Sequence, residues 1–237
     1  MKLERAMIFA AGRGERMRPL TDATAKPLLE VGGKHLIEWH LQKLGAAGIS
    51  RVVINTSWRA RQFPAALGDG SRWNLEIDYI DEGPVALETG GGMLNALDRL
   101  GGEPFLLLNG DIWIDMDFAH LAHAPDSLAH LVMVANPAHV AHGDFALESD
   151  GHLTDSGPAR LTYSGVGVYR AALFDDWRTA LHGHAGAAET PARFPLAPLL
   201  RAAMRQHQVS GEFFAGDWVD VGTPQRLAEL DRRLRNP

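Results

Sequence analysis

The chain has 237 residues, of which 46% are hydrophobic and 22% are charged, and its formal net charge is −6. This is an ordinary globular composition, so it excludes a disordered tail, a collagen-like repeat and a coiled coil. The chain contains no cysteine, which excludes disulfides, cysteine-based zinc sites, iron–sulfur ligation and a cysteine nucleophile.

Basic side chains are concentrated near the N-terminus. Residues 1–60 contain 10 of the 23 Lys and Arg but only 5 of the 29 Asp and Glu. An acidic chain with one basic segment is a poor general binder of nucleic acid, but it suits a small polyanion bound locally. The sequence has no apolar run of about 18 residues and no secretory signal pattern. We therefore expect a cytoplasmic protein with no nucleic-acid partner and no membrane partner.

The first half of the chain alternates predicted strands and helices. Short apolar or β-branched runs favour strands, and apolar residues at helical spacing favour helices. The expected elements are a strand Ala6–Ala10, a helix Leu36–Ala47, a strand Arg51–Thr56, a helix Ala60–Leu67, a strand Leu75–Asp81, a helix Gly92–Leu100 and a strand Phe105–Asn109. This order predicts an α/β fold, Rossmann-like, with a mostly parallel sheet flanked by helices.

The second half of the chain is less regular. Its expected elements are strands at His130–Ala135, Phe145–Glu148, Tyr163–Tyr169 and Trp218–Val221, and helices at Leu196–His207 and from Thr223 to Arg235. The segment Leu181–Pro195 is rich in Ala, Gly, His and Pro, and is interpreted as a mobile surface insertion. No long polar linker interrupts the chain, so we expect a single domain over residues 1–237.

The most informative motif follows the first predicted strand. Gly12 and Gly14 allow backbone N–H groups to approach a phosphate, and four cations lie in or near this loop: Arg13, Arg16, Arg18 and Lys26. The loop is not a Walker A sequence, and the third glycine of a dinucleotide-binding fingerprint is missing. These residues favour the binding of a triphosphate.

Two aspartates could hold a hard cation. Asp111 follows the strand Phe105–Asn109, at the end where α/β sheets place their ligands. Asp220 lies in an otherwise apolar strand, where an unpaired charge is costly and needs a cation or another partner. Mg²⁺ prefers one or two carboxylates together with phosphate oxygens and water. A turn or capping role for Asp111, and a capping or salt-bridged role for Asp220, are the structural alternatives.

A third glycine-rich motif, Glu88-Thr-Gly-Gly-Gly92, precedes a predicted helix. Glycines at this place let a flat ring lie against the backbone, and the helix N-terminus favours negative groups. A nucleotide base or ribose could bind here, although a simple glycine turn explains the segment nearly as well.

Taken together, these motifs resemble those of the sugar-1-phosphate nucleotidyltransferases. The resemblance rests on Gly12-x-Gly-x-Arg16-x-x-Pro19-Leu20-Thr21, Lys26-Pro27-Leu28, Asn109-Gly110-Asp111 and Trp218-x-Asp220-x-Gly222-Thr223. It implies a nucleotidyltransferase fold of the GT-A-like type, with a nucleotide-binding half at about residues 1–115 and a sugar-binding half at about residues 116–237. One departure is Pro195, which stands where the family pattern has Lys.

The resemblance also implies substrates and residue roles. Glu88–Gly92, the short chain and Val-Ser-Gly-Glu212 are most similar to family members that use UTP and N-acetylmuramate 1-phosphate. The implied cofactor is Mg²⁺, held by Asp111 and Asp220, with Arg16 and Lys26 as catalytic cations. The implied nucleotide-binding residues are Ala10, Ala11, Gly12, Arg13, Gly14, Glu82 and Gly90, and the implied sugar-binding residues are Asn109, Asn136, Gly143, Asp144 and Gly165.

Three alternatives stay open at this point. GTP with mannose 1-phosphate, or dTTP with glucose 1-phosphate, would need the same motifs. A non-catalytic sensor of nucleotide sugars would keep the glycine loop but tolerate the loss of Lys26 or of a metal carboxylate, and all of these residues are present. We expect a monomer or a small homo-oligomer.

Overall fold

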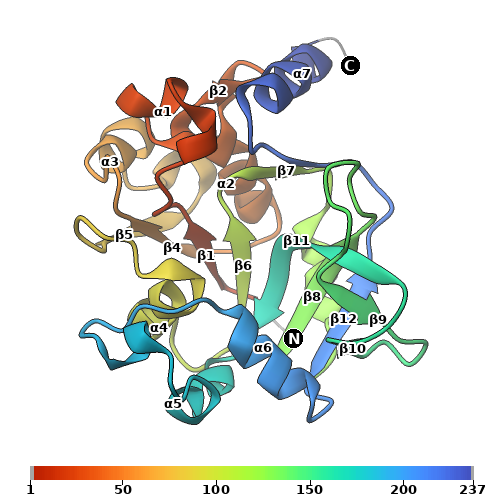
Figure 1. Cartoon of the computed structure of the whole chain (residues 1–237). Coiled ribbons are helices and arrows are strands. Elements are labelled where there is room, and N and C mark those ends of the chain that lie inside the picture. Colours follow the sequence, from red (N-terminus) through yellow and green to blue (C-terminus); the bar gives the residue numbers. More distant parts are fainter. Residues whose placement is uncertain (1–2, 236–237) are drawn as a thin grey trace. The chain divides into compact units, whose positions relative to one another are not determined.

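The computed structural model of the chain describes residues 3–235. Its contacts divide the chain into two compact units that interleave along the sequence (Figure 1). The N-terminal unit comprises residues 4–86, 108–119 and 217–235, and the central unit comprises Leu3 with residues 87–107 and 120–216. The two units therefore cannot be divided at one position near residue 115, because residues 217–235 belong to the N-terminal unit.

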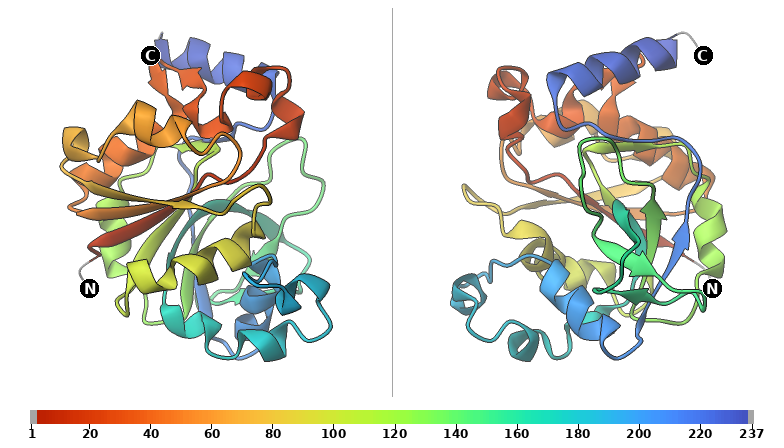
Figure 2. Two further views of the ribbon diagram at one scale, coloured as in Figure 1. Left: turned by 90° about the vertical axis from the view of Figure 1, so that its left-hand side faces the viewer. Right: turned by 45° about the vertical axis from the view of Figure 1, so that its right-hand side comes forward.

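Parallel strands form the framework of the N-terminal unit. Strands β1 (Arg5–Phe9), β4 (Arg51–Thr56) and β5 (Glu76–Asp81) are parallel neighbours, and the end of β6 (Phe105–Asn109) comes next to β1 in the strand order. Figure 2 shows these strands side by side, with α2 (Leu36–Ala46) and α3 (Gln62–Leu67) on one side of them. The expected alternation of strands and helices is confirmed for this part of the chain.

Shorter elements complete the N-terminal unit. They are α1 (Leu20–Ala23), the hairpin of β2 (Glu30–Val31) and β3 (Lys34–His35), the antiparallel pair of β7 (Ile112–Ile114) and β13 (Trp218–Asp220), and α7 (Pro224–Arg235). Helix α7 lies against β2, although nearly 200 residues separate them along the chain (Figure 1). The N–H of Gly32 donates to Asp231 Oδ1 at 2.8 Å, which ties the hairpin to this helix.

One apolar cluster joins distant segments of the N-terminal unit. Its buried members are Met17, Leu29, Val31, Leu36, Trp113, Val221, Leu227 and Leu230. They come from the glycine loop, the β2–β3 region, β7 and the C-terminal segment. Burying apolar area stabilises the fold by about 25 cal/mol per Å², so this cluster holds those segments at fixed positions.

The central unit contains a mixed set of strands. Strand β8 (Ala129–Val134) pairs antiparallel with β11 (Arg160–Tyr169) and parallel with β12 (Val209–Phe213). Strands β9 (Phe145–Leu147) and β10 (Leu153–Thr154) extend this arrangement by antiparallel pairing. Its helices are α4 (Glu88–Leu100), α5 (Trp177–Ala180) and α6 (Ala197–Met204).

The structure corrects two sequence expectations in the central unit. Helix α4 begins at Glu88 rather than at Gly92, so the glycines lie in its first turns. The segment Leu181–Pro195 is not a free insertion: Phe194 is fully buried and its ring stacks on Trp177 at 5.0 Å between centroids. The sequence analysis missed this anchor because the segment has few apolar residues and Phe194 is its one aromatic residue.

Candidate active site

The glycine loop leaves the end of β1 and is fixed by β4. The N–H of Ala10 lies 3.0 Å from Asn55 Oδ1 and 3.2 Å from the Asn55 carbonyl. Gly14 has a φ of +68°, a conformation that side chains disfavour, and an added Cβ would also lie only 3.0 Å from Thr21 Cγ2. A Cβ at Gly12 would meet nothing within 4 Å. Gly14 is therefore required by the loop itself, whereas Gly12 borders open space that a ligand could occupy.

The three arginines of the loop are not equivalent. Arg13 stacks on Trp58 at 4.6 Å and pairs with Glu15 at 3.1 Å. Arg18 pairs with Asp22 at 2.7 Å. Arg16 is exposed and has no ion-pair partner within residues 3–235. It is therefore the guanidinium of this loop that is available to a phosphate.

Lys26 and Asp111 form the tightest ion pair of the candidate site. Lys26 Nζ lies 2.6 Å from Asp111 Oδ2, and the lysine side chain is only 8% exposed. The turn before Asp111 is locked in place, since Gly110 donates to the Phe9 carbonyl at 2.9 Å and a Cβ on Gly110 would lie 2.6 Å from that oxygen. Burial in a medium of low dielectric strengthens such a pair.

Asp220 lies on the strand that pairs with the segment after Asp111. Strand β13 runs antiparallel to β7, with Asp220 opposite Ile112, and Val221 donates its N–H to the Asp111 carbonyl at 3.0 Å. Arg226 of α7 donates through Nη1 to Asp220 Oδ2 at 2.7 Å. The two aspartates predicted from sequence therefore belong to the same unit and to neighbouring backbone segments.

The residues present fit a magnesium ion. Asp111 and Asp220 each use Oδ2 in an ion pair with a basic side chain, and their side chains are 41% and 24% exposed. Two carboxylates suit Mg²⁺, because this ion usually keeps waters and phosphate oxygens as its other ligands. The described residues contain no group of three or more His, Asp or Glu side chains that could hold a metal ion by themselves. Two carboxylates would therefore suit a cation that shares its remaining ligand positions with a phosphate and water, and not one held in an all-protein cage.

Asn55 supports two of the predicted nucleotide-binding residues, and the sequence analysis missed it. Its Oδ1 accepts from the Ala10 N–H and its Nδ2 donates to Glu82 Oε1 at 2.7 Å, while Asn55 itself is 2% exposed. Asn55 thereby links two residues predicted to contact the nucleotide. The available sequence signal was the polar pair Asn55-Thr56 at the end of an otherwise mostly apolar strand.

His40 lies beneath the turn that carries Asp111. The residue is 1% exposed and packs near Phe118, with 6.5 Å between ring centroids. Burial lowers the pKa of His40 to about 4, and the backbone of Ile112 opposes this shift by hydrogen bonding. The imidazole is therefore neutral near pH 7 and supports the Asn109–Asp111 turn without adding charge.

Four of the predicted sugar-binding residues gather along β11 in the central unit. Asn136 donates to the Arg160 carbonyl at 2.9 Å, and Asp144 Oδ2 accepts from the Tyr163 N–H at 2.8 Å. Gly143 packs on the Arg160 backbone, and Gly165, with a φ of +83°, lies in the irregular stretch of β11 between Tyr163 and Gly167. The fifth residue, Asn109, ends β6 in the N-terminal unit.

Gly90 has a structural role that sequence did not suggest. Gly90 and Gly91 both donate their N–H groups to the Phe194 carbonyl, at 2.9 and 3.0 Å. A Cβ on Gly90 would lie 2.5 Å from the Phe194 ring, and one on Gly91 would overlap the Ala192 carbonyl. These donors of the first turn of α4 are thus occupied by the chain itself, so any contact of Gly90 with a base would use other atoms.

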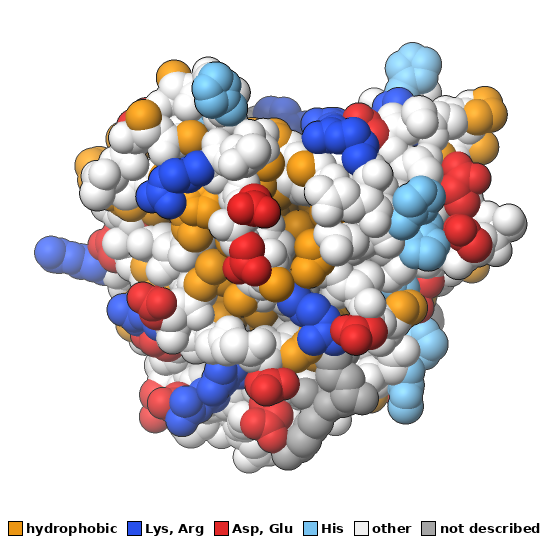
Figure 3. Space-filling view, turned by 90° about the horizontal axis from the view of Figure 1, so that it is seen from below, with side chains coloured by type: hydrophobic (Ala, Val, Ile, Leu, Met, Phe, Trp, Pro, Cys, Tyr) orange, Lys and Arg blue, Asp and Glu red, His pale blue; other side chains and the backbone are white. Residues whose placement is uncertain are grey.

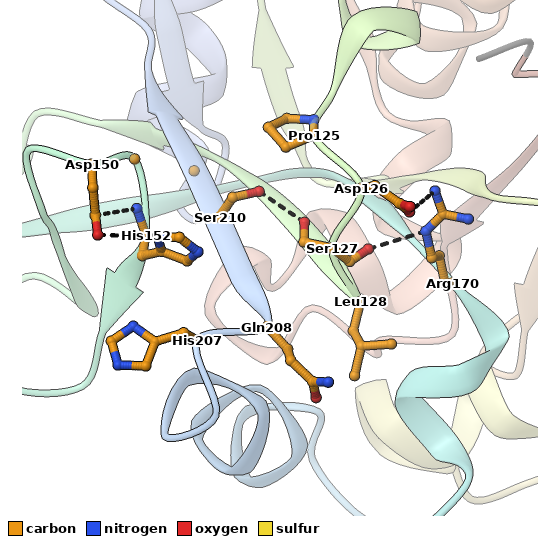
Figure 4. A pocket seen from close by; sticks show the side chains of 12 residues that line it. Pro125, Asp126, Ser127, Leu128, Asp150, His152, Arg170, His207, Gln208 and Ser210 are labelled. Atoms are coloured by element: carbon orange, nitrogen blue, oxygen red, sulfur yellow. Dashed lines mark hydrogen bonds and ion pairs between the residues drawn. The ribbon is translucent and has the colours of Figure 1, made fainter.

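Two hollows of the central unit are lined by no residue that sequence assigned to the site. One, of about 340 Å³, is shown in Figure 4: Ser210 bonds Ser127, Asp150 lies against His152, and Asp126 pairs with Arg170. The other, of about 380 Å³, lies between α5 and α6 and is lined by Leu173, Leu199 and Asp176 among others. Figure 3 views the molecule from the side of these helices and shows apolar side chains gathered around acidic ones.

Comparison with known proteins now identifies the family. A nucleotidyl transferase family model matches residues 5–143, which include the glycine loop, Lys26 and Asp111. The chain is 48% identical over 232 residues to the N-acetylmuramate alpha-1-phosphate uridylyltransferase of Neisseria meningitidis, covering 95% of this chain and 96% of that protein. The chain belongs to the sugar-1-phosphate nucleotidyltransferase family.

Other relatives agree with this assignment. A protein of the same name from Caulobacter vibrioides is 34% identical over 244 residues, covering 97% of this enzyme and 96% of that protein. The inositol-1-phosphate CTP transferase of T. maritima superposes with a TM-score of 0.78 at 17% identity, covering 99% and 97% of the two chains. A Bacillus anthracis protein solved in complex with a sucrose gives a TM-score of 0.82 at 16% identity, with coverage of 98% and 96%. The α/β fold predicted from sequence is confirmed, and within residues 3–235 no helix is long and apolar enough to cross a membrane.

Proposed function

We propose that this enzyme transfers uridine monophosphate from UTP to N-acetylmuramate 1-phosphate and releases pyrophosphate. The observation that carries the proposal is the junction of Lys26, Asp111 and Asp220, in which a buried cation and two carboxylates occupy neighbouring backbone segments. The choice of base and sugar is supported by the identity of 48% to the Neisseria uridylyltransferase over nearly the whole of both chains.

The reaction requires charge compensation more than proton transfer. An oxygen of the acceptor phosphate, already ionised at neutral pH, forms a bond to the α-phosphorus, and the bond to the leaving pyrophosphate breaks. Repulsion between the two polyanions is the main barrier, and cations aimed at the transferred phosphoryl group lower it. We assign this role to the exposed guanidinium of Arg16 and the ammonium of Lys26.

Asp111 and Asp220 would hold Mg²⁺ at this junction. When bound, the ion would neutralise phosphate charge and fix the triphosphate geometry. The remaining chain would orient the substrates: Ala10, Ala11 and Gly12 would present backbone to the base and ribose, and Glu82, which accepts from Asn55 Nδ2, would lie beside the base. Residues along β11 are proposed for the sugar, namely Asn136, Gly143, Asp144 and Gly165.

A guanylyltransferase is the second candidate. The mannose-1-phosphate guanylyltransferase of Mycobacterium tuberculosis is 36% identical over 137 residues, although the match covers only 56% of this chain and 38% of that protein. Since the match spans little more than half of the chain, it supports the shared chemistry more than the acceptor.

The substrate assignment is tested by measuring pyrophosphate release over a matrix of donors and acceptors. UTP, dTTP and GTP are each combined with the 1-phosphates of N-acetylmuramate, glucosamine, mannose and glucose. We expect the highest kcat/KM for UTP with N-acetylmuramate 1-phosphate. A higher value for GTP with mannose 1-phosphate would replace the proposed function by the second candidate.

The assignment of the reacting centre is tested by Lys26→Met and Asp111→Asn. Each is expected to reduce kcat/KM by roughly 10²–10⁴-fold, because cations and metal ligands of this kind contribute several kcal/mol to the transition state. Lys34→Met is the control, since Lys34 lies over the Trp39 ring on a surface hairpin. Near-wild-type rates in both site variants would refute the assignment.

A further inference from the structure

Each proposed metal carboxylate is already matched by a basic side chain. Lys26 Nζ lies 2.6 Å from Asp111 Oδ2, and Arg226 Nη1 lies 2.7 Å from Asp220 Oδ2. The side chains of Lys26 and Arg226 are only 8% and 18% exposed, so water screens these pairs less than it screens surface ion pairs. The junction therefore offers a divalent cation two carboxylates whose charge is largely offset.

The residues between Asp220 and Arg226 leave space for the two side chains to pair. A Cβ on Gly222 would lie 2.5 Å from Arg226 Nη2 and 3.0 Å from Asp220 Oδ1, so a side chain at position 222 would obstruct the pair. The hydroxyl of Thr223 lies 3.3 Å from the Arg226 N–H and 3.4 Å from Arg226 Nε. Gly222 thus leaves space for the guanidinium, and the Thr223 hydroxyl contacts the backbone N–H and Nε of Arg226.

The packing of helix α7 fixes the position of the Arg226 backbone. Leu227, the next residue along the helix, and Leu230 are buried in the apolar cluster that also contains Val221 and Trp113. Because this cluster joins β7, the segment after β13 and α7, the spacing between Arg226 and Asp220 does not depend on a bound nucleotide.

We propose that Arg226 is a positioning residue that occupies Asp220 in the nucleotide-free enzyme and makes binding of the divalent cation depend on the triphosphate. The inference rests on the proposed function, since Asp111 and Asp220 are its metal ligands. A free cation gains little Coulomb energy from carboxylates already paired with Lys26 and Arg226. A triphosphate adds several negative charges beside the same carboxylates, so the cation binds when the nucleotide accompanies it.

The proposal differs from a purely structural ion pair in a measurable way. A pair that only holds α7 in place would, when broken, lower the free energy of unfolding and leave the cation affinity unchanged or weaker. Under the proposal, removing the guanidinium strengthens the binding of a cation in the absence of nucleotide, because an unpaired carboxylate attracts it more strongly.

The test is a titration of the nucleotide-free enzyme with Mn²⁺, followed by the electron paramagnetic resonance signal of the free ion. Arg226→Gln is expected to bind Mn²⁺ at least about tenfold more tightly than the wild type. Arg235→Gln is the matched control: it removes the same charge from the same helix, where Arg235 pairs with Asp231, and we expect wild-type affinity. Arg226→Lys retains a cation and should fall near the wild type. If Arg226→Gln does not fold, the Mn²⁺ affinity of the wild type with and without UTP remains the deciding measurement.

Two further measurements complete the test. Adding Asp220→Asn to Arg226→Gln should abolish the gain, which would place the extra affinity at this carboxylate. With UTP present, the wild type and Arg226→Gln should differ by less than about threefold, because the triphosphate then supplies the charge. Unchanged or weaker Mn²⁺ binding by Arg226→Gln, or equally tight binding by the wild type with and without UTP, would overturn the proposal.

The outcome is separable from that of the proposed function. A wild-type enzyme that transfers no nucleotide in the donor and acceptor matrix would refute the function, whatever the Mn²⁺ titration gives. Normal nucleotide transfer together with the contrary titration result would refute only the role of Arg226.

Discussion

The arginines of the glycine loop differ in whether their charge is already paired with a carboxylate. Arg18 is committed to Asp22 and Glu15, whereas Arg16 is exposed and unpaired within the described chain. We expect Arg16→Ala to lower kcat/KM by roughly 10²-fold or more, as loss of a phosphate-directed donor does. Arg18→Ala should cost less than about tenfold, because exposed ion pairs contribute little. Steady-state kinetics of both variants decide this, and an equal loss in the two would contradict the distinction.

His40 predicts a pH dependence of stability. Its pKa is about 4 in the folded chain and 6.5 in the unfolded one, so the unfolded state takes up the proton first as the pH falls. The corresponding stability is fully present above pH 6.5, is lost as the pH falls toward 4 and changes no further below that. A shift of this size corresponds to about 3 kcal/mol.

Denaturant unfolding between pH 7.5 and 4 measures this contribution. His40→Gln is expected to flatten the decline relative to the wild type, because the variant has no imidazole to protonate. The control is His184→Gln, which removes an exposed histidine and should leave the decline unchanged. A decline in His40→Gln as steep as in the wild type would show that other groups cause it.

At the residue scale, sequence motifs singled out Lys26, Asp111 and Asp220, whose roles stay predictions, but not the residues that support them. Lys26, Asp111 and Asp220 belong to recognisable motifs, and the structure brings all three into one unit. Asn55 and Arg226 act through partners 45 and 6 residues away, and the pattern of an apolar strand or an amphipathic helix does not indicate such partners. Long-range hydrogen bonding requires knowledge of the register between strands, which one sequence does not supply.

At the scale of elements, the period of apolar residues predicted most of the longer strands and helices, although the five-residue strand β12 was missed. Strand β4 has the predicted bounds, and α7 ends at Arg235 as expected. The two- and three-residue strands β2 and β7 were missed, since so short a run has no measurable period. The early start of α4 was missed because glycine disfavours helices, and the packing of Ala192 and Phe194 on Gly91 and Gly90 overrides that preference.

The packing at α4 predicts a contrast between two glycines. Gly91→Ala would drive a Cβ into the Ala192 carbonyl, so we expect the free energy of unfolding to fall by about 2–4 kcal/mol. Gly102→Ala, in the loop after α4, meets nothing within 4 Å and should change stability by less than about 0.5 kcal/mol. Chemical denaturation of both variants measures the contrast, and equal stabilities would mean that residues 192–194 do not pack there in solution.

At the scale of the whole chain, the C-terminal segment completes the N-terminal unit. Residues 217–235 contribute β13, Asp220 and α7, and the buried Leu230 lies in the cluster with Met17 and Trp113. Leu230→Ala should lower the free energy of unfolding by about 2–5 kcal/mol through lost burial and the cavity left behind. The matched control is Leu20→Ala at a position that is 41% exposed, where we expect less than about 0.5 kcal/mol.

The same variant should affect catalysis as well as stability. Because the cluster joins the glycine loop to the segments bearing Asp111 and Asp220, Leu230→Ala is expected to raise KM for the nucleotide even at temperatures where it stays folded. Unfolding curves and kinetics at 15 °C, about the temperature at which many domains are most stable, measure the two effects on one preparation. Normal KM in a destabilised variant would show that the cluster stabilises the unit without positioning the loop.

The late position of Asp220 has a consequence for biosynthesis. A ribosome that has translated the first 216 residues has made the glycine loop, Lys26 and Asp111, but neither the second carboxylate nor the arginine that pairs with it. The nascent polypeptide at that stage also lacks α7, whose Leu227 and Leu230 pack in one apolar cluster with Met17 of the glycine loop. Under the proposed function, activity is therefore expected only after residues 217–235 have left the exit tunnel, and a chain that stops at residue 216 is expected to be inactive.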